Sequence, residues 1–468
     1  MDRARVDSGS RALKLCFQLV LGLILMPALR NAAFAQPAAP SLTLEQAVTI
    51  ALEKNPLHKA AIAETHAATA DVRVARSLLL PRVSFSETAT RGNDPVYVFG
   101  SKLRQQRFTT ADFALNTLNT PPPLGNFGTR FGGTWNLFDS FASWKGINRA
   151  KQMSKAAGYQ LDRTQQEIVL RVIRFYYEVL LVDRKLDVSE RSAKTALSIK
   201  DRSQVRFDSG LVVESDLLAA QVRLAARQQE VIQERNNVEM ARAQLNTAMG
   251  MPVASSFGFP AVLAERALPV AGLEDWEKLA LAKRPDLKRI AAEEAAQHQS
   301  VAIAKSSFGP RVNAFASWES DNPTFAAGGG GSNWMGGMEI EFDIFQGGAK
   351  RAELFRQRAL EDKVAALKQA ASDAVRLEVR RAYYDVDASR QQLEVARVAI
   401  AQAQENLRIN QDRYDSGLTT ITDVLGAEEA ARRSQTDYWE ALYRFYSRYA
   451  DLELASGTLN AHSPVVMP

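Results

Sequence analysis

The chain has 468 residues, and 58 lysine and arginine residues against 53 aspartate and glutamate residues give a formal net charge of +5. The charges are interspersed as on solvated helix faces, and no basic arm or block indicates nucleic-acid binding. The single cysteine, Cys16, lies in a segment that we expect to be removed, which excludes disulfides and thiolate metal sites from the mature chain.

Residues 1–35 are predicted to be a secretory signal peptide. Basic residues precede an apolar run over residues 15–29, and Ala33-Phe34-Ala35 has the Ala-x-Ala pattern of a cleavage site. The alternative is a membrane anchor. The apolar run is shorter than the roughly 20 residues that span a bilayer as a helix, and Pro27 interrupts it. We therefore expect export and a mature chain that begins at Gln36.

Most of the mature chain is predicted to be two copies of one unit. Residues from 138 to 250 return later in the chain at one fixed offset, and a register held over this length indicates duplication. We place the first repeat at 36–250, a linker that crosses between the repeats at 251–272, the second repeat at 273–457, and a flexible tail at 458–468. Corresponding residues include Arg174 and Arg381, Tyr176-Tyr177 and Tyr383-Tyr384, Phe207-Asp208-Ser209-Gly210-Leu211 and Tyr414-Asp415-Ser416-Gly417-Leu418, Asp216 and Asp423, and Gly250 and Gly457.

Each repeat is predicted to open with a helical stretch followed by two strands. The helical stretches are 57–80 and 286–308, and each begins just after an X-Pro step. The hydrophobic period then changes to alternation, which indicates strands with one apolar and one polar face. The earlier strands, 83–91 and 312–319, fit less cleanly because Glu87 falls on the face of Val83 and Phe85. Alternating apolar residues of the later strands are Phe131, Trp135 and Leu137 in the first repeat and Trp334, Met338, Ile340 and Phe342 in the second.

The first strand pair is predicted to carry a much longer loop than the second, within residues 92–129. This loop contains Tyr97-Val98-Phe99-Gly100-Ser101-Lys102-Leu103 and Pro121-Pro122-Pro123. We expect it to face outward, and its sequence assigns it no ligand.

Two long helical hairpins are predicted to follow the strand pairs. Glycine and proline are absent from residues 159–209 and 349–416, and the first helix, taken as 140–206, would be roughly 100 Å long. Each long helix ends at Asp-Ser-Gly, where glycine supplies the left-handed conformation that ends a helix, and return helices follow at about 214–249 and 420–456. The second long helix has large residues every seven positions with small residues three positions later, as in a close-packed coiled-coil seam: Val379, Val386, Leu393, Ile400, Leu407 and Tyr414, then Ala382, Ser389, Ala396 and Ala403.

Catalysis finds no support in the sequence. The four histidines show no metal-ligand spacing, and no glycine-rich phosphate loop follows a strand. We therefore predict that the protein is not an enzyme and has no cofactor or metal site.

The strands indicate a barrel that several chains share. One chain supplies four strands, whereas even the smallest membrane barrels need about eight. An open sheet in lipid would leave its edges unpaired, and no mature segment offers a continuous apolar run long enough for a helical span. We therefore expect several protomers to share one barrel, which the helices extend away from the membrane.

The doubled order of strands and helices, the two Asp-Ser-Gly-Leu tips and the Tyr-Tyr pairs resemble the TolC-like outer-membrane efflux protein family over roughly residues 42–457. The resemblance implies an α+β membrane protein built from duplicated β-hairpin plus long α-helical hairpin units. It implies a homotrimer, with a twelve-stranded β-barrel in outer-membrane lipid of a Gram-negative bacterium and a twelve-helix α-barrel in the periplasm. The function implied is a passive exit channel that receives substrate from an inner-membrane pump through a periplasmic adaptor.

The resemblance also assigns roles at the helical tips. The family's arginine latch is replaced here by Thr419 and its second inward aspartate by Gly426, so any latch must be weaker or built from other residues. Asp423, repeated by symmetry, would place a ring of negative charge at the constriction and favour cations. The resemblance predicts adaptor docking at Gly210, Leu211, Gly417 and Leu418, and a periplasmic gate at Ser215, Asp216, Tyr414, Thr419 and Asp423.

Other interpretations of these residues remain open. Asp216 and Asp423 lie in first turns of helices, where an acid stabilises the helix dipole without any pore. Asp208 and Asp415 fit turn residues, and the tyrosine pairs fit packing between helices.

Two other classes of protein share some of these features. A periplasmic adaptor is also exported and has a long helical hairpin, but it has one hairpin within flanking β-domains, whereas this chain has two. A coiled-coil scaffold without a pore would need neither alternating strands nor tryptophans near strand ends, such as Trp135, Trp318 and Trp334.

Overall fold

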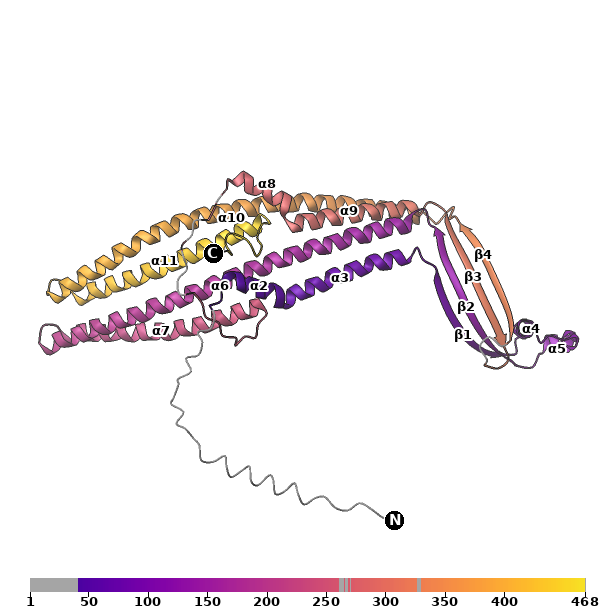
Figure 1. Cartoon of the computed structure of the whole chain (residues 1–468), viewed down its shortest axis with the longest axis horizontal. Helices are drawn as coiled ribbons and strands as arrows, with labels where there is room; N and C mark the ends of the chain where they lie inside the picture. Colours follow the sequence, from indigo (N-terminus) through magenta and orange to yellow (C-terminus); the bar gives the residue numbers. More distant parts are fainter. Residues whose placement is uncertain (1–40, 261–264, 266–267, 270, 326–329, 468) are drawn as a thin grey trace, which may run out of the picture. The chain divides into compact units, whose positions relative to one another are not determined.

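The computed structural model describes residues 41–260, 265, 268–269, 271–325 and 330–467. The predicted signal peptide lies outside these residues. A small unit contains Ser41 and Leu42 with residues 256–260, and a parallel bridge joins Ser41 to Gly258. The helices and strands described below belong to the second unit (Figure 1).

The second unit contains two repeats with the same order of elements, and each begins with one helix more than the sequence predicted, α2 and α8. Two short helices lead into strands, and a 67-residue helix with a shorter return helix follows in each repeat. The first repeat consists of α2 (Leu44–Lys54), α3 (Pro56–Ser77), β1 (Arg82–Gly92), β2 (Leu124–Phe138), α6 (Ala142–Asp208) and α7 (Glu214–Met249), with α4 (Pro95–Arg104), η1 (Thr110–Phe113) and α5 (Leu115–Asn119) between its strands. The second consists of α8 (Leu273–Lys283), α9 (Pro285–Ser306), β3 (Arg311–Asn322), β4 (Gly331–Glu341), α10 (Ala349–Asp415) and α11 (Ile421–Ala455).

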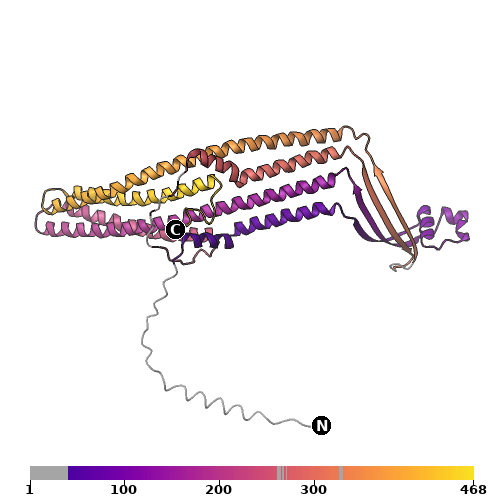
Figure 2. The same ribbon diagram turned by 45° about the horizontal axis from the view of Figure 1, so that its top comes forward.

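The short helices cover the parts of the long helices that the return helices leave open. Helix α6 packs against α7 and α3, and α10 packs against α11 and α9. Helices α9 and α11 also contact α6, so they join the two repeats (Figures 1 and 2). The helical stretches predicted at 57–80 and 286–308 correspond to α3 and α9, and they pack against the long helices.

The core lies between the helices and uses part of the predicted seam. Val379, Val386 and Leu393 of α10 are buried, as are the small residues Ala382 and Ser389. Tyr177 of α6 stacks on Tyr446 of α11 with ring centroids 5.2 Å apart. Its counterpart in the second repeat, Tyr384, is 61 % exposed, so the expected packing of all four tyrosines is not found within one chain.

The four strands form one antiparallel sheet in the order β1-β2-β3-β4, so the two repeats meet at the β2–β3 pair. The alternation predicted from the sequence separates two faces. One face carries an aromatic residue at the same level on every strand, because Phe85 pairs with Phe131, Phe131 with Trp318, and Trp318 with Trp334. We call this set the aromatic row, and the face that carries it the apolar face.

The opposite face, which we call the polar face, carries hydrophilic residues at the neighbouring levels. Ser86 pairs with Arg130, Arg130 with Glu319, and Glu319 with Asn333. Strands with two such different faces are typical of a sheet that separates lipid from water. Among the described residues, no helix combines the length and the apolar character needed to cross a membrane.

The C-terminal segment after Gly457 corrects the prediction of a flexible tail at 458–468. Leu459, Val465 and Val466 are buried, and the hydroxyl of Tyr177 donates to the carbonyl of Val465 at 3.1 Å. The segment packs because it brings apolar side chains to the aromatic core between α6 and α11.

The helical tips as a candidate docking site and gate

The two hairpin tips have the same backbone structure. Gly210 and Gly417 adopt left-handed φ values of 69° and 74°. In the first tip, the amide of Gly210 donates to Phe207 at 2.9 Å and that of Leu211 to Arg206 at 2.8 Å. The second tip repeats both hydrogen bonds. This pair of backbone hydrogen bonds is the Schellman motif, which ends helices at glycine.

Each tip presents a leucine to solvent. Leu211 is 67 % exposed and Leu418 is 69 % exposed. An apolar side chain that the fold leaves uncovered at the same position of both tips is a candidate contact for another protein. The structure therefore places the four predicted docking residues together in two equivalent turns.

Two arginines of the first hairpin hold the second tip. Arg202 pairs with Asp415 at 2.8 Å, and Arg206 donates to the carbonyl oxygens of Tyr414 at 2.7 Å and Asp415 at 3.2 Å. The Arg206 guanidinium also lies over the Tyr414 ring, 4.8 Å from its centre. Cations at the C-terminal end of α10 are favourable because the last carbonyls of a helix carry partial negative charge.

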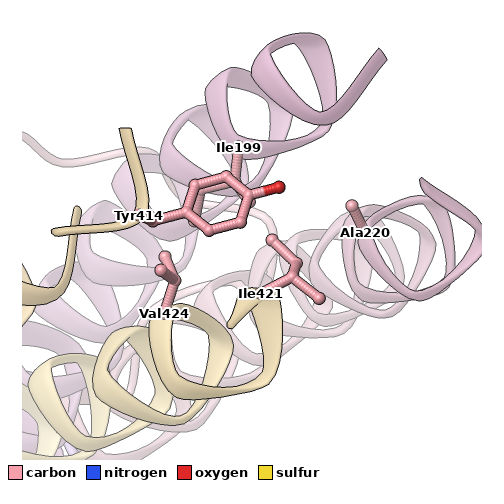
Figure 3. Packing of buried hydrophobic residues seen from close by; sticks show 5 residues of the cluster. All are labelled: Ile199, Ala220, Tyr414, Ile421 and Val424. Carbon is pink, nitrogen blue, oxygen red and sulfur yellow. The ribbon is translucent and has the colours of Figure 1, made fainter. Parts of the chain in front are cut away.

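Tyr414 lies inside the contact between the hairpins. It is 4 % exposed and packs in a cluster with residues of α6, α7 and α11 (Figure 3). Its hydroxyl is 3.4 Å from that of the buried Ser203. The cluster consists of Ile199, Ala220, Tyr414, Ile421 and Val424.

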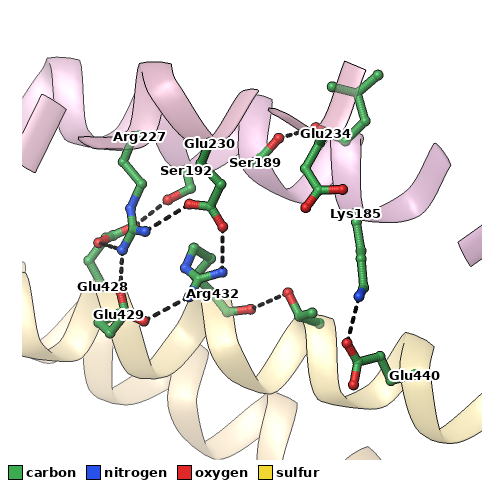
Figure 4. Close-up of polar contacts among 12 residues, drawn as sticks. Lys185, Ser189, Ser192, Arg227, Glu230, Glu234, Glu428, Glu429, Arg432 and Glu440 are labelled. Atoms are coloured by element: carbon green, nitrogen blue, oxygen red, sulfur yellow. Dashed lines mark hydrogen bonds and ion pairs between the residues drawn. The ribbon is translucent and has the colours of Figure 1, made fainter. Parts of the chain in front are cut away.

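An ion network with a buried pair at its centre joins α7 to α11 beyond this cluster (Figure 4). Arg227, whose side chain is 6 % exposed, lies 3.0 Å from Glu428, whose side chain is 2 % exposed. Arg227 also pairs with Glu429 and, at 2.9 Å, with Glu230. Arg432 bonds to Glu230 at 2.8 Å and to Glu429 at 2.7 Å. We call these five residues the inter-hairpin network.

Bonds between opposite charges favour the ionised forms of Arg227 and Glu429. Burial lowers the pKa of Arg227, but hydrogen bonds to Glu428 and Glu429 outweigh burial and raise that pKa above its usual range. The hydrogen bond from Arg432 lowers the pKa of Glu429 to about 2, with a further contribution from Arg227. Ser192 of α6 donates to Glu428, so the network reaches a third helix.

Asp423 caps its own helix. Its carboxylate accepts bonds from the hydroxyl of Thr419 at 2.7 Å and from the hydroxyl and amide of Thr420 at 2.6 and 3.1 Å. These bonds from Thr420 and Thr419 lower the pKa of Asp423. The capping interpretation therefore has direct support, and Thr419 occupies a position beside Asp423 instead of bridging to the first hairpin.

The predicted gate residues do not form one cluster. Ser215 is exposed and Asp216 is half-buried in the first turn of α7. Within the described chain, no side-chain hydrogen bond links Asp216 to Tyr414, and Tyr414 faces Ser203 instead. The gate residues that we predicted at the two tips are thus spread over a cap, a packed core and an exposed turn.

The chain matches a protein-family model described as outer membrane efflux protein over residues 47–251 and 276–458. The chain belongs to this family. It is 23 % identical over 453 residues to the alkaline protease secretion protein AprF of Pseudomonas aeruginosa, covering 92 % of this chain and 86 % of that one. It is 24 % identical over 422 residues to the outer membrane protein TolC of Salmonella enteritidis, covering 87 % and 80 %.

Solved structures share the fold. The outer membrane channel CmeC of Campylobacter jejuni superimposes with a TM-score of 0.75 at 17 % identity, covering 94 % of this chain and 95 % of that one. This efflux protein is thus an outer-membrane exit channel of a tripartite efflux or secretion system. The family consists of channels and not of enzymes, and the alternatives of a periplasmic adaptor or a scaffold without a pore are set aside.

The contacts that join the hairpins were not predicted from the sequence. Their residues do carry a signal, because Arg202 and Arg206, like Arg223 and Arg227, are four positions apart and share one helix face. The adjacent acids Glu428 and Glu429 lie 11 and 12 residues beyond Gly417, whereas Arg223 and Arg227 lie 13 and 17 residues beyond Gly210. Only the structure shows that these charges face one another.

Proposed function

We propose that three copies of the chain form one conduit, with a twelve-stranded β-barrel in outer-membrane lipid and a twelve-helix tunnel in the periplasm. The observation that carries this proposal is the sheet. Within the described residues its edge strands β1 and β4 each pair on one side only, while the aromatic row crosses all four strands. Three sheets joined edge to edge would satisfy both edges and make the aromatic row a continuous belt at the membrane boundary.

Cross-linking tests the shared barrel. The mature chain is expected to have no cysteine, so one cysteine in β1 can be combined with cysteines scanned along β4. The proposal predicts disulfides between chains at one register, and a ladder of covalent products that ends at three chains. A ladder that continues past three chains, or no product at any register, would contradict it.

The tips are proposed to dock the periplasmic adaptor. Leu211 and Leu418 are the apolar contacts, and Gly210 and Gly417 shape the turns that present them. Leu211→Asp with Leu418→Asp should abolish adaptor binding by the purified channel. Leu115→Asp is the matched control, because Leu115 is 77 % exposed in the loop between β1 and β2. Equal adaptor binding by both proteins would refute docking at the leucines.

The closed state of the periplasmic end is proposed to depend on the inter-hairpin network, in place of the arginine that Thr419 replaces. Opening a helical tunnel requires the second hairpin to move relative to the first, and this movement must separate Arg227 from Glu428. Ser215, Asp216, Tyr414 and Asp423 then act around the opening, where Asp423 contributes negative charge to the constriction. An inner-membrane pump supplies the substrate, since the chain has no energy source of its own.

A further inference from the structure

The loop between β1 and β2 is a folded insert. Residues 93–123, which we call the loop insert, contain α4, η1 and α5. Phe108 holds them together, with its ring centre 4.8 Å from that of Phe99 and 5.1 Å from that of Phe113. Lys102 pairs with Asp112 at 2.6 Å across the same turn. Helix α4 therefore has a defined place relative to η1.

One side of α4 faces the sheet. Val98, Ser101 and Gln105 are buried, and their spacing of three and four residues puts them on one stripe of the helix. Val96 on the other side is 81 % exposed. Helix α4 thus has a covered side and an open side.

Two side-chain contacts of α4 reach residues of the polar face. Gln105 donates to the side chain of Asn126 at 2.8 Å, and Arg104 pairs with Glu319 at 3.4 Å. Asn126 and Glu319 belong to the same face as Arg130, because residues two apart on a strand share a face.

Backbone geometry at the two edge strands also places α4 over the polar face. A Cβ placed on Gly92 of β1 would meet the Tyr97 ring at 3.6 Å. A Cβ on Gly331 of β4 would lie 1.9 Å from the carbonyl oxygen of Arg104. Gly92 and Gly331 both present their Cβ direction to the polar face, so α4 crosses that face from one edge strand to the other.

The polar face below the insert is hollow. A hollow of about 420 Å³ on this face is lined by Ser84, Ser86, Arg130 and Ser317, together with the apolar side chains of Phe315 and Met335. In a closed barrel this polar face would line the lumen, and the apolar face with its aromatic row would meet lipid. The insert then lies over the end of the lumen that faces away from the helices.

The width of a helix relative to the barrel decides whether the loop insert can narrow the mouth. Twelve strands about 4.8 Å apart and tilted by about 40° enclose a backbone ring roughly 24 Å across. A helix with its side chains is about 10 Å wide, so helices that lie along the wall all round this ring would leave an opening of only roughly 4 Å. One α4 from each of three chains would therefore occupy most of the mouth.

We propose that the loop insert is a plug that narrows the outer mouth of the channel and limits the size of solutes that can enter the lumen from outside. The inference rests on the proposed function, since it requires the polar face to line a pore. It assigns a role to the long first loop, which the second repeat lacks.

Thiol labelling of intact cells tests the plug. Ser84→Cys and Val83→Cys are neighbours on β1 that point to the polar and the apolar face, and each is made with and without the insert. In the shortened protein a glycine-serine linker replaces residues 95–119. A small charged maleimide reports whether the polar face is in water. A maleimide on a long polyethylene glycol chain reports the width of the outer mouth.

The plug predicts that the small reagent labels Ser84→Cys in both proteins, while the large reagent labels it only when the insert is shortened. Arg104→Ala with Gln105→Ala keeps the insert but removes its anchors, and should raise labelling by the large reagent toward the rate of the exposed Leu115→Cys. This second variant keeps the test valid if the shortened protein does not assemble.

Two failures can be told apart. In the first, the large reagent labels Ser84→Cys equally with and without the insert, whether labelling is fast or absent. This result would overturn the plug but would not contradict the shared barrel. Labelling of Val83→Cys but not Ser84→Cys by the small reagent would show that the polar face does not line the pore, and would overturn the proposed function with it.

Discussion

Replacing Arg227 by methionine should open the channel. The change removes the cation that lies 3.0 Å from Glu428, whose side chain is 2 % exposed. Loss of one partner of a buried ion pair costs about 3–5 kcal/mol, because the remaining charge stays buried without compensation. Arg223, 3.9 Å from the same oxygen, offsets part of this cost, so we expect about 2–4 kcal/mol.

If opening exposes Glu428 to water, the free-energy cost of leaving its charge unpaired destabilises the closed state but not the open state. A shift of 2 kcal/mol then changes the closed-to-open ratio by roughly 30-fold, and a larger shift changes it more. Single-channel recording in planar bilayers measures this ratio directly. Wild-type channels should stay mostly in a low-conductance state, and Arg227→Met channels should stay mostly open.

Two further variants test the reasoning. Arg235→Met makes the same change on α7 at an exposed pair with Glu190, and should leave the recordings unchanged because exposed pairs contribute little. Arg227→Met combined with Glu428→Gln removes the uncompensated charge and should restore most of the closure. Open probability that is the same for Arg227→Met and Arg235→Met would refute the role of the network.

Three other changes follow from the structure. Burial raises the pKa of Glu453 to about 8, so the neutral form stabilises the fold fully below about pH 4, and this stability is lost as the pH rises to about 8. Glu453→Gln should therefore flatten the fall in melting temperature over this range, and an unchanged slope would contradict this reasoning. Gly457→Ala should lower the melting temperature, because the φ of Gly457 is 72° and the new Cβ would lie 2.8 Å from the backbone of Arg284. Gly426→Ala in α11 should raise the melting temperature, because the new Cβ meets no atom within 4 Å and alanine favours a helix. The reverse order of the two melting temperatures would refute this account. Asp423→Ala should reduce the cation preference measured by reversal potentials, and an unchanged preference would limit Asp423 to capping α11.

The helices and strands could be predicted because their signals are local. The absence of glycine and proline marks all of α10 and the part of α6 that follows Gly158, and Asp-Ser-Gly marks the ends of both helices near Gly210 and Gly417. Alternation placed the strands with the correct faces, including Glu87 on the apolar face beside Phe85. The repeat reinforced each of these predictions with a second copy.

Contacts between the repeats could not be predicted in the same way. Whether Arg206 faces Tyr414 or solvent depends on the rotation of α6 about its axis and on the register between two hairpins, which no local pattern sets. Of the predicted gate residues, Asp216 and Tyr414 belong to different repeats, and no side-chain hydrogen bond joins them within the described chain. Asp423 bonds within its own first turn, which was predictable from the Thr-x-x-Asp spacing of a capping box.

The tail and the loop insert show another limit. Residues 458–467 have few features of a helix or strand, so they resemble a flexible end, yet Val465 and Val466 are buried in the core between α6 and α11. Their placement depends on a site that exists only after the helices have packed. The polar residues that anchor the loop insert, such as Arg104 and Gln105, likewise form no motif that could be recognised in the sequence.

Native mass spectrometry of the protein extracted with detergent from outer membranes tests the central claim, which is that three chains share one barrel. The account predicts a trimer of mature chains that begin at Gln36. A soluble monomer or dimer that needs no detergent would contradict the shared barrel, and with it the proposed gate and plug.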